Sequence, residues 1–310
     1  MTADKTLNKR GMTIEKSGII KEYHLNRYEP HKPQLTLHDL KRYLKTNQQQ
    51  VIKPHIHSFY QLIWFKKGKG KHFVDFNSYD VFGNSMFFIA PNQVHYFDKN
   101  TGYEGVLIHF NEDFLIHNES ERDFFLKSNI FNTPYQSPSC PILTDINDIL
   151  DTYILQMIEE LESGENFGKE LILQNCLKSF LIQIQRSRNK IQHSTYFLSS
   201  LMDEKRIQLA KFIKLIDEYY KKGYSIPEYA QLLHISSRSL SNLTQKQLNK
   251  TPFQMIQERI VLEAQRLLLY SELNINQIGY HLGFDDPSYF VKYFKKYTKI
   301  SPTEFRRALS

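Results

Sequence analysis

Three histidines have the residue type and spacing of a metal or ligand site. His55 and His57 are two positions apart, so in an extended strand their side chains point to the same face. His95 follows in a later strand-like run. Imidazole nitrogens bind zinc, nickel and iron well. Two interpretations stay open: the rings bind a metal ion, or they shape a pocket without one.

Other sequence patterns give little support to an enzyme. The run Lys66–Lys71 has the composition of a phosphate-binding loop, but it lacks the required spacing and falls between two strand-like segments. The sequence has neither a GxSxG nucleophile elbow nor a glycine-rich dinucleotide fingerprint. An enzymatic function would therefore depend on the three histidines.

Length and composition indicate a globular chain of two domains. The 310 residues exceed the usual ~100 to 200 of one domain, and 41% hydrophobic residues exclude a largely disordered chain. No apolar run approaches the ~18 residues of a membrane helix, and the N-terminal segment lacks the apolar core of a signal peptide. We therefore expect a cytoplasmic location and no membrane partner. Cys140 and Cys176 are too few for a disulfide scaffold, so we expect buried thiols.

The N-terminal half predicts β-structure. Phe59–Phe65 and His72–Phe76 are short aromatic and β-branched runs on either side of a Gly-Lys-Gly turn, which predicts a hairpin. Further strands are expected at Met86–Ala90, His95–Phe97 and Val106–Phe110. Strands at this spacing favour a small barrel or sandwich.

Apolar residues over 145–186 recur with the period of an α-helix, in contrast to the strand-like runs before them. Apolar side chains form one stripe in each half of this segment, and Ser163-Gly164 separates the halves, which predicts a helical hairpin. Its stripes can pack against the barrel or against a second copy of the chain. Tyr153, Met157 and Phe180 are our candidates for a dimer contact.

The basic excess lies in the last third of the chain. Residues 203–310 hold 17 basic and 11 acidic residues, whereas residues 1–202 hold 23 and 22. A cationic domain is typical of proteins that bind the phosphate backbone. The polar stretch at 187–202 has no sustained helical stripe and lies where the charge changes, so it is our predicted linker.

This last third contains an internal repeat. The repeated residues are Ile226, Ala230 and Leu233, which recur as Ile275, Gly279 and Leu282 after 49 positions, and Thr251-Pro252, which recurs as Ser301-Pro302 after 50 positions. Each copy has the pattern of two short helices joined by a tight turn, which is a helix-turn-helix unit. A long helix over 252–269 is expected to join the two units.

Turn and cap residues support this prediction. Gly283 and His234 occupy equivalent turn positions, where backbone of positive φ is expected. Ser236 can cap the second helix of the first unit, and Asp285 or Asp286 can cap that of the second.

The segment from about 205 to 308 closely resembles the DNA-binding domain of AraC/XylS-type transcriptional regulators. The motifs that carry the resemblance are Ala264–Leu269, Ile275–Ile278, Gly283–Phe290, Phe294–Lys296, Ser301-Pro302 and Phe305-Arg306. The sequence departs from the family at Gly279, where alanine is more usual. The resemblance implies double-stranded DNA and RNA polymerase as partners, a homodimer, and a role that is more often activation than repression.

Position within the motif assigns roles to the exposed side chains. Expected base contacts come from Arg238, Ser241 and Asn242 in the first unit and from Pro287, Ser288 and Lys292 in the second. Expected phosphate contacts come from Ser236, Thr251, Lys295, Lys296 and Ser301. Expected core residues are Leu240, Leu243, Tyr289, Phe290, Phe294 and Phe305.

The N-terminal half resembles a cupin sensing domain, through Pro54–Gln61, Gly68, Gly70 and Phe88–His95. Metal cupins commonly have a glutamate where this sequence has Gln61, a poorer ligand for hard metals. The resemblance to regulatory cupins is closer. It implies an effector pocket at His55, His57, Gln61 and His95, with no metal and no cofactor.

The predicted fold is a multi-domain α+β chain. It has a cupin-like β-barrel at 1–144, a dimerising helical hairpin at 145–186, the linker at 187–202 and an all-α domain with two helix-turn-helix units at 203–310. The predicted function is regulation of transcription, as an activator, by sequence-specific DNA binding under control of an unidentified small molecule, without enzymatic activity. The alternatives are a metal-dependent cupin enzyme fused to a DNA-binding domain, and an architectural DNA-binding protein with no effector.

Overall fold

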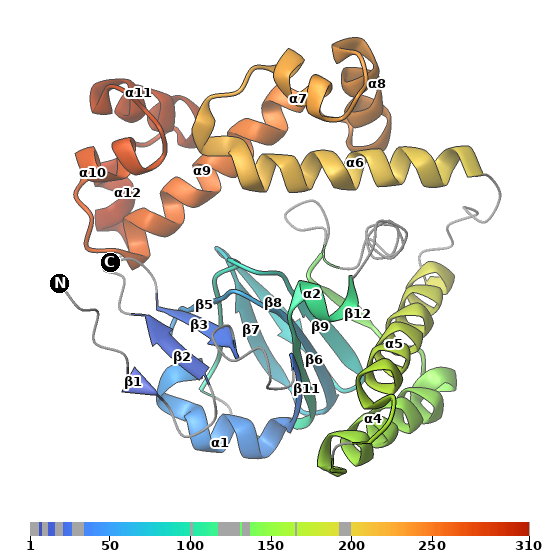
Figure 1. The fold of residues 1–310 in the computed structure, drawn as a ribbon. Helices are drawn as coiled ribbons and strands as arrows, with labels where there is room; N and C mark the ends of the chain where they lie inside the picture. Colours follow the sequence, from blue (N-terminus) through green and yellow to red (C-terminus); the bar gives the residue numbers. More distant parts are fainter. Residues whose placement is uncertain are drawn as a thin grey trace. The chain divides into compact units, whose positions relative to one another are not determined.

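The computed structural model describes residues 6–7, 12–15, 21–26, 34–99, 102–116, 131, 137–164, 166–191 and 200–309. These residues form two compact units, one reaching Ile191 and the other beginning at Ser200 (Figure 1). Within the described residues, no helix has the length and apolar character needed to cross a membrane.

The described part of the first unit is built on three sheets. Its strands are β1 (Thr6–Leu7), β2 (Met12–Glu15), β3 (Glu22–Leu25), β4 (Leu35–Asp39), β5 (Ile56–His57), β6 (Tyr60–Lys67), β7 (Gly70–Val74), β8 (Asn77–Val81), β9 (Ser85–Ile89), β10 (His95–Phe97), β11 (Glu104–Phe110) and β12 (Ser139–Pro141). The sheet orders are β1-β2-β3-β5, β10-β7-β8 and β12-β9-β6-β11-β4. A bridge between His55 and His95 joins the first two sheets.

Side-chain alternation in β6 explains the two larger hydrophobic cores of this unit. Ile63 and Phe65 belong to the barrel interior, together with apolar side chains from β7, β8, β9, β10 and β11. Leu62 and Trp64 point to the other face and pack with the helices that cover the sheet. Gln61 shares the face of Ile63 and Phe65, so it points into the barrel.

The predicted hairpin around the Gly-Lys-Gly turn is wrong. Strand β6 pairs with β9 and β11, whereas β7 pairs with β8 and β10, so the turn carries the chain from one sheet to another. Its glycines allow Tyr103 to pack closely, since a Cβ at Gly70 would come within 2.0 Å of the Tyr103 hydroxyl oxygen. Strand β8, which the sequence patterns did not identify, completes the smaller sheet.

Helices after β11 cover the outer face of the larger sheet, whereas the helix at 40–51 packs into the barrel-interior core (Figure 1). The helices of this unit are α1 (Leu40–Val51), α2 (Glu112–Leu115), η1 (Thr144–Ile146), α4 (Asn147–Glu162) and α5 (Lys169–Ile191). Helices α4 and α5 form the hairpin that the apolar stripes predicted. Met157 and Phe180, however, are fully buried in the sheet–helix core and are not free for a dimer contact, whereas Tyr153 is only partly buried against it.

The linker begins later than predicted. Helix α5 continues to Ile191, and Ser187 and Arg188 are buried in its last turns. The Ser187 hydroxyl accepts a hydrogen bond from the Leu143 backbone N–H at 3.2 Å. Of the predicted linker at 187–202, residues 192–199 lie outside the described residues, and a helix begins at Ser200.

The second unit is helical. Its elements are α6 (Ser200–Tyr219), η2 (Tyr220–Lys222), α7 (Ile226–Leu232), α8 (Ser237–Leu248), α9 (Pro252–Tyr270), α10 (Ile275–His281), α11 (Pro287–Thr298) and α12 (Pro302–Leu309). The long helix predicted between the two repeats is confirmed as α9. It begins with a capping box between Thr251 and Gln254 and with proline in its first turn.

Candidate functional site

The two repeats fold as two matching helix-turn-helix units. In the first, α7 and α8 are joined through His234, whose φ is 54°, and the Ile235 N–H donates to the Ala230 carbonyl at 3.0 Å. The Ser236 hydroxyl then caps α8 by accepting from the Ser239 N–H at 3.1 Å.

The second unit repeats this geometry with different residues. Gly283, at φ 86°, occupies the position of His234, and the Phe284 N–H donates to the Gly279 carbonyl at 3.0 Å. Asp286, and not Asp285, caps α11, since its carboxylate accepts from the Ser288 N–H at 2.8 Å. The predicted positive φ values at both turns are confirmed.

Helices α8 and α11 present the predicted base-contact residues to solvent. Arg238, Ser241 and Asn242 lie three and four positions apart on α8, so their side chains share one face, and all three are exposed. Ser288 and Lys292 are exposed at the same spacing on α11, whereas Pro287, in its first turn, is half-buried.

The predicted phosphate-contact residues are also accessible. Lys295 and Lys296 are exposed near the end of α11. Ser236 and Thr251 are exposed and Ser301 is half-buried, and each of these side chains accepts a backbone N–H at a helix start. Each hydroxyl therefore has a defined position before any partner binds.

Tyr289 is not a core residue. Its side chain is 60% exposed, although Phe290, the next residue on α11, is fully buried. The ring lies beside Phe284 and Tyr293, at centroid distances of 5.9 and 6.5 Å. It therefore adds an exposed aromatic residue between Ser288 and Lys292, which the sequence argument missed because it assigned aromatic residues on this helix to the core.

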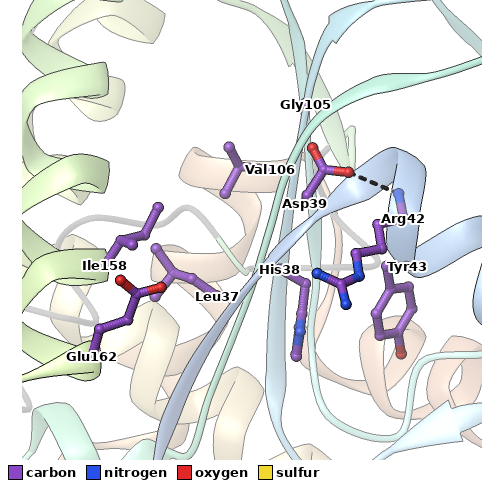
Figure 2. Close-up of a pocket in the computed structure, with 9 residues that line it drawn as sticks. All are labelled: Leu37, His38, Asp39, Arg42, Tyr43, Gly105, Val106, Ile158 and Glu162. Carbon is purple, nitrogen blue, oxygen red and sulfur yellow. Dashed lines mark hydrogen bonds between the residues drawn. The ribbon is translucent and has the colours of Figure 1, made fainter.

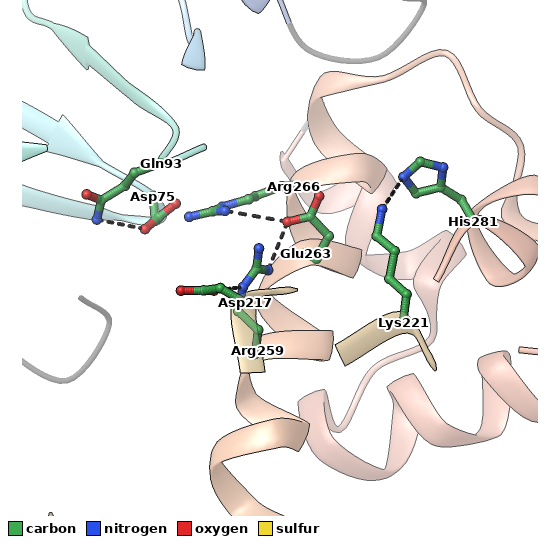
Figure 3. A network of polar contacts seen from close by, with 8 residues as sticks. All are labelled: Asp75, Gln93, Asp217, Lys221, Arg259, Glu263, Arg266 and His281. Atoms are coloured by element: carbon green, nitrogen blue, oxygen red, sulfur yellow. Dashed lines mark hydrogen bonds and ion pairs between the residues drawn. The ribbon is translucent and has the colours of Figure 1, made fainter. Parts of the chain in front are cut away.

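An ion-pair network around the buried Arg259 supports the helices that hold these units (Figure 3). Arg259 of α9 contacts Asp217 of α6 at 2.6 Å and Glu263 at 2.9 Å, and Glu263 also pairs with Arg266 at 3.5 Å. Burial raises the pKa of Glu263, but the surrounding positive charges, led by Arg259 and Arg266, outweigh it and hold the pKa below its ordinary value. The network therefore fixes α6 against α9.

The three predicted histidines come together inside the barrel. His55, His57 and His95 are all buried, and one ring nitrogen from each lies within 4.8 Å of the other two. Burial lowers the pKa of His55 to about 4. Burial, with a smaller contribution from neighbouring histidines, also lowers the pKa of His57 and His95 well below the ordinary value. All three rings are therefore neutral near pH 7.

Further polar side chains line the same interior. Gln61 and His109 are opposite each other in the β6–β11 pair, and His72 lies across from Tyr79 in the β7–β8 pair. Gln61, His72 and His109 each carry at least one buried side-chain nitrogen without a hydrogen-bond partner. Sequence reasoning identified Gln61 but missed His72 and His109, which lie in single strands without a spacing pattern.

A separate cavity of about 390 Å³ lies outside this interior (Figure 2). It is lined by residues of β4, α1, β11 and α4, among them His38, Arg42, Tyr43 and Glu162. None of the predicted effector residues lines it. The Asp39 carboxylate at its edge accepts from the Arg42 backbone N–H at 2.7 Å and so caps α1.

Comparisons with known proteins agree with both halves of this description. A family described as "AraC-like ligand binding domain" matches residues 37–177, and a family described as "Helix-turn-helix domain" matches residues 229–308. The chain is an AraC-type transcriptional regulator. It is 25% identical over 261 residues to the "HTH-type transcriptional activator RhaS" of Mannheimia succiniciproducens, covering 83% of this chain and 90% of that protein.

Two further proteins are similar to this chain over all or part of its length. This AraC-type regulator is 29% identical over 143 residues to the "Arabinose operon regulatory protein" of Escherichia coli, and the match covers 46% of each chain. Among solved structures, that of ToxT from Vibrio cholerae is similar over 89% of this chain and 98% of that one, with 15% identity and a TM-score of 0.40.

Proposed function

We propose that this AraC-type regulator activates transcription from specific duplex DNA sites, reading bases with α8 and α11. The observation that carries the proposal is the matched pair of helix-turn-helix units, each with an exposed set of polar side chains at the start of its second helix. Arg, Asn and Lys have the donor geometry that base edges in the major groove accept. The proposed base contacts are Arg238, Ser241, Asn242, Pro287, Ser288 and Lys292.

Phosphate contacts would set the register of the two helices on DNA. We assign them to Ser236, Thr251, Lys295, Lys296 and Ser301, whose side chains lie at helix starts or at the end of α11. Such contacts carry affinity without sequence preference. Activation also implies a contact with RNA polymerase, which is supported by the activator named among the relatives.

We assign control to the N-terminal barrel, as the pocket of a small effector around His55, His57, Gln61 and His95. Buried polar atoms without partners in this interior support a ligand site. We propose a cytoplasmic homodimer without catalytic activity of its own. The amide at Gln61, in place of the carboxylate common in catalytic metal cupins, supports a regulatory role.

A selection experiment tests the central claim. Full-length protein is incubated with a library of randomised duplexes at two salt concentrations, and bound sequences are determined. We expect enrichment of one long, non-palindromic motif, with affinity that falls steeply as salt rises because bound counterions are released. Binding without any enriched sequence would refute sequence-specific recognition.

A further inference from the structure

Main-chain hydrogen bonds hold His55, His57 and His95 in place. The His55 N–H donates to the His95 carbonyl at 3.3 Å, and the His95 N–H donates to the His55 carbonyl at 3.0 Å. His57 pairs with Tyr23 in the parallel β3–β5 pair, and its carbonyl accepts from the Asn92 N–H at 2.8 Å. Hydrogen bonds therefore fix the main chain at all three histidines.

The ring nitrogens have the separations of ligands around one ion. His95 Nε2 lies 3.2 Å from both ring nitrogens of His57. Two nitrogens bound at about 2.05 Å to one tetrahedral zinc ion are about 3.3 Å apart. All three residues offer a nitrogen within 4.8 Å of the others, so the ring of His55 lies near the same point.

The orientation of His55 also suits a ligand. Its Nδ1 lies 2.7 Å from the Lys53 carbonyl oxygen, which can only accept, so Nδ1 carries the proton and Nε2 keeps its lone pair. Histidines that bind metals commonly have their other nitrogen fixed by a carbonyl or carboxylate in this way. The buried Nδ1 of His95 has no partner, which leaves this ring free to rotate without losing a bond there.

We propose that His55, His57 and His95 bind one late first-row divalent ion, such as Zn²⁺ or Ni²⁺, inside the barrel. A donor set of imidazoles alone favours these ions over Mg²⁺ and Ca²⁺, which prefer oxygen. Three protein ligands are sufficient for zinc, so Gln61 does not exclude a metal, contrary to the sequence-based expectation. The rings of His72 and His109 lie outside this set of three, with centroids 5.4 Å from that of His95 and 6.0 Å from that of His57, respectively.

Calorimetric titration of the full chain tests this site. Protein produced without a histidine tag and stripped with a chelator is titrated with ZnCl₂, NiCl₂ and MgCl₂. We expect one Zn²⁺ or Ni²⁺ per chain and no response to Mg²⁺. His57→Gln and His95→Gln should each weaken Zn²⁺ binding by at least about 100-fold, since even residues that only orient ligands cost 10- to 100-fold.

His72→Gln is the matched control, because this ring is buried in the same interior but does not belong to the triad. It should keep wild-type affinity. X-ray absorption of the zinc-loaded wild type gives a readout that needs no variant to fold, and should show about three imidazole ligands. Absence of stoichiometric binding, equal loss in His72→Gln, or a spectrum without imidazole ligands would each overturn the proposal. No DNA is present, so the outcome is independent of the regulatory function.

Discussion

The Nζ of Lys221 lies 2.8 Å from the Nε2 of His281 (Figure 3). Lys221 belongs to η2, directly after α6, and His281 is the last residue of α10. The carbonyl of Lys221 also lies against the turn of the second helix-turn-helix unit, where a Cβ on Gly283 would come within 1.9 Å of its oxygen. An ammonium group can only donate, so the His281 ring must be neutral at Nε2 for this contact to form.

Acidification should therefore destabilise the second unit. Partial burial, followed by the charge of Lys221, lowers the pKa of His281 below 6.5, with Glu263 acting in the opposite direction. The unfolded chain then binds more protons than the folded one as pH falls through this range, so stability is lost below about pH 6.5. We expect the melting temperature of the wild type to fall on acidification. The melting temperature of His281→Gln should fall less. Equal pH dependence in both proteins would contradict this role of His281.

Gly279→Ala tests the close contact between α10 and α11. A Cβ at this position would lie 3.3 Å from both Phe290 Cβ and Pro287 Cα, which is tight but requires a shift of only a few tenths of an ångström. Alanine favours the helix by about 1 kcal/mol over glycine. We expect a net gain between zero and about 1 kcal/mol in urea unfolding. The equivalent Ala230→Gly in the first unit should lower the free energy of unfolding by about 1 kcal/mol or more. If Gly279→Ala also lowered the free energy of unfolding, α10 and α11 could not move apart enough to accept the added methyl group.

Local sequence patterns predicted the second unit well. The turn conformations at His234 and Gly283, the cap at Ser236 and the start of α9 at Pro252 all follow from interactions between residues a few positions apart. Such short-range interactions are visible in the sequence because the residues that form them are close neighbours. The prediction that Tyr289 is a core residue was wrong because residue type alone does not show which side of a helix is covered.

The barrel was harder to predict because its strand pairs are distant in sequence. The run that includes Phe65 was identified correctly as a strand. Its partners, however, are β9 and β11, and not the next strand along the chain. The convergence of His55 and His95 likewise depends on one isolated bridge between distant segments. Spacing placed His55 and His57 on one face, but no local pattern placed His95 beside them.

Self-association should depend on the exposed side of the α4–α5 hairpin. Leu155 is 59% exposed on α4 and Leu171 is 60% exposed on α5, in contrast to the buried Met157. The double variant Leu155→Glu, Leu171→Glu should weaken the proposed dimer in sedimentation without lowering the melting temperature. Met157→Ala should instead cost about 2 to 5 kcal/mol of stability. If the double variant remained as dimeric as the wild type, the dimer interface would have to lie elsewhere on the chain.

Tyr289 should contribute to DNA affinity and little to folding. Its side chain is exposed on α11 directly after Ser288, and a tyrosine hydroxyl can donate to a phosphate. Tyr289→Phe should weaken binding to all sequences by about 0.5 to 1.5 kcal/mol and change stability by less than about 0.5 kcal/mol. Tyr280→Phe is the control, because Tyr280 is similarly exposed but lies on α10. A stability loss without an effect on DNA would restore Tyr289 to a structural role.

Asn242 and Lys292 should read different parts of one DNA site. They lie on α8 and α11, at the two ends of α9, whose 19 residues span about 28 Å. With the widths of the flanking helices, this length brings the two units to major-groove segments about one turn, or ~34 Å, apart. Asn242→Ala and Lys292→Ala should each weaken specific binding by roughly 1 to 3 kcal/mol, and relax base preference at positions about ten base pairs apart.

Lys296→Ala supplies the contrast. Lys296 is an exposed cation beyond the base-contact residues of α11. Its loss should weaken binding to all DNA sequences nearly alike and reduce the slope of the salt dependence of binding by about one unit. The three variants are compared by titration on the randomised library at two salt concentrations. If Asn242→Ala and Lys292→Ala changed preference at the same base pairs, or only lowered affinity uniformly, one helix-turn-helix unit would be a structural support. In that case its base contacts would have to be reassigned to the phosphate backbone.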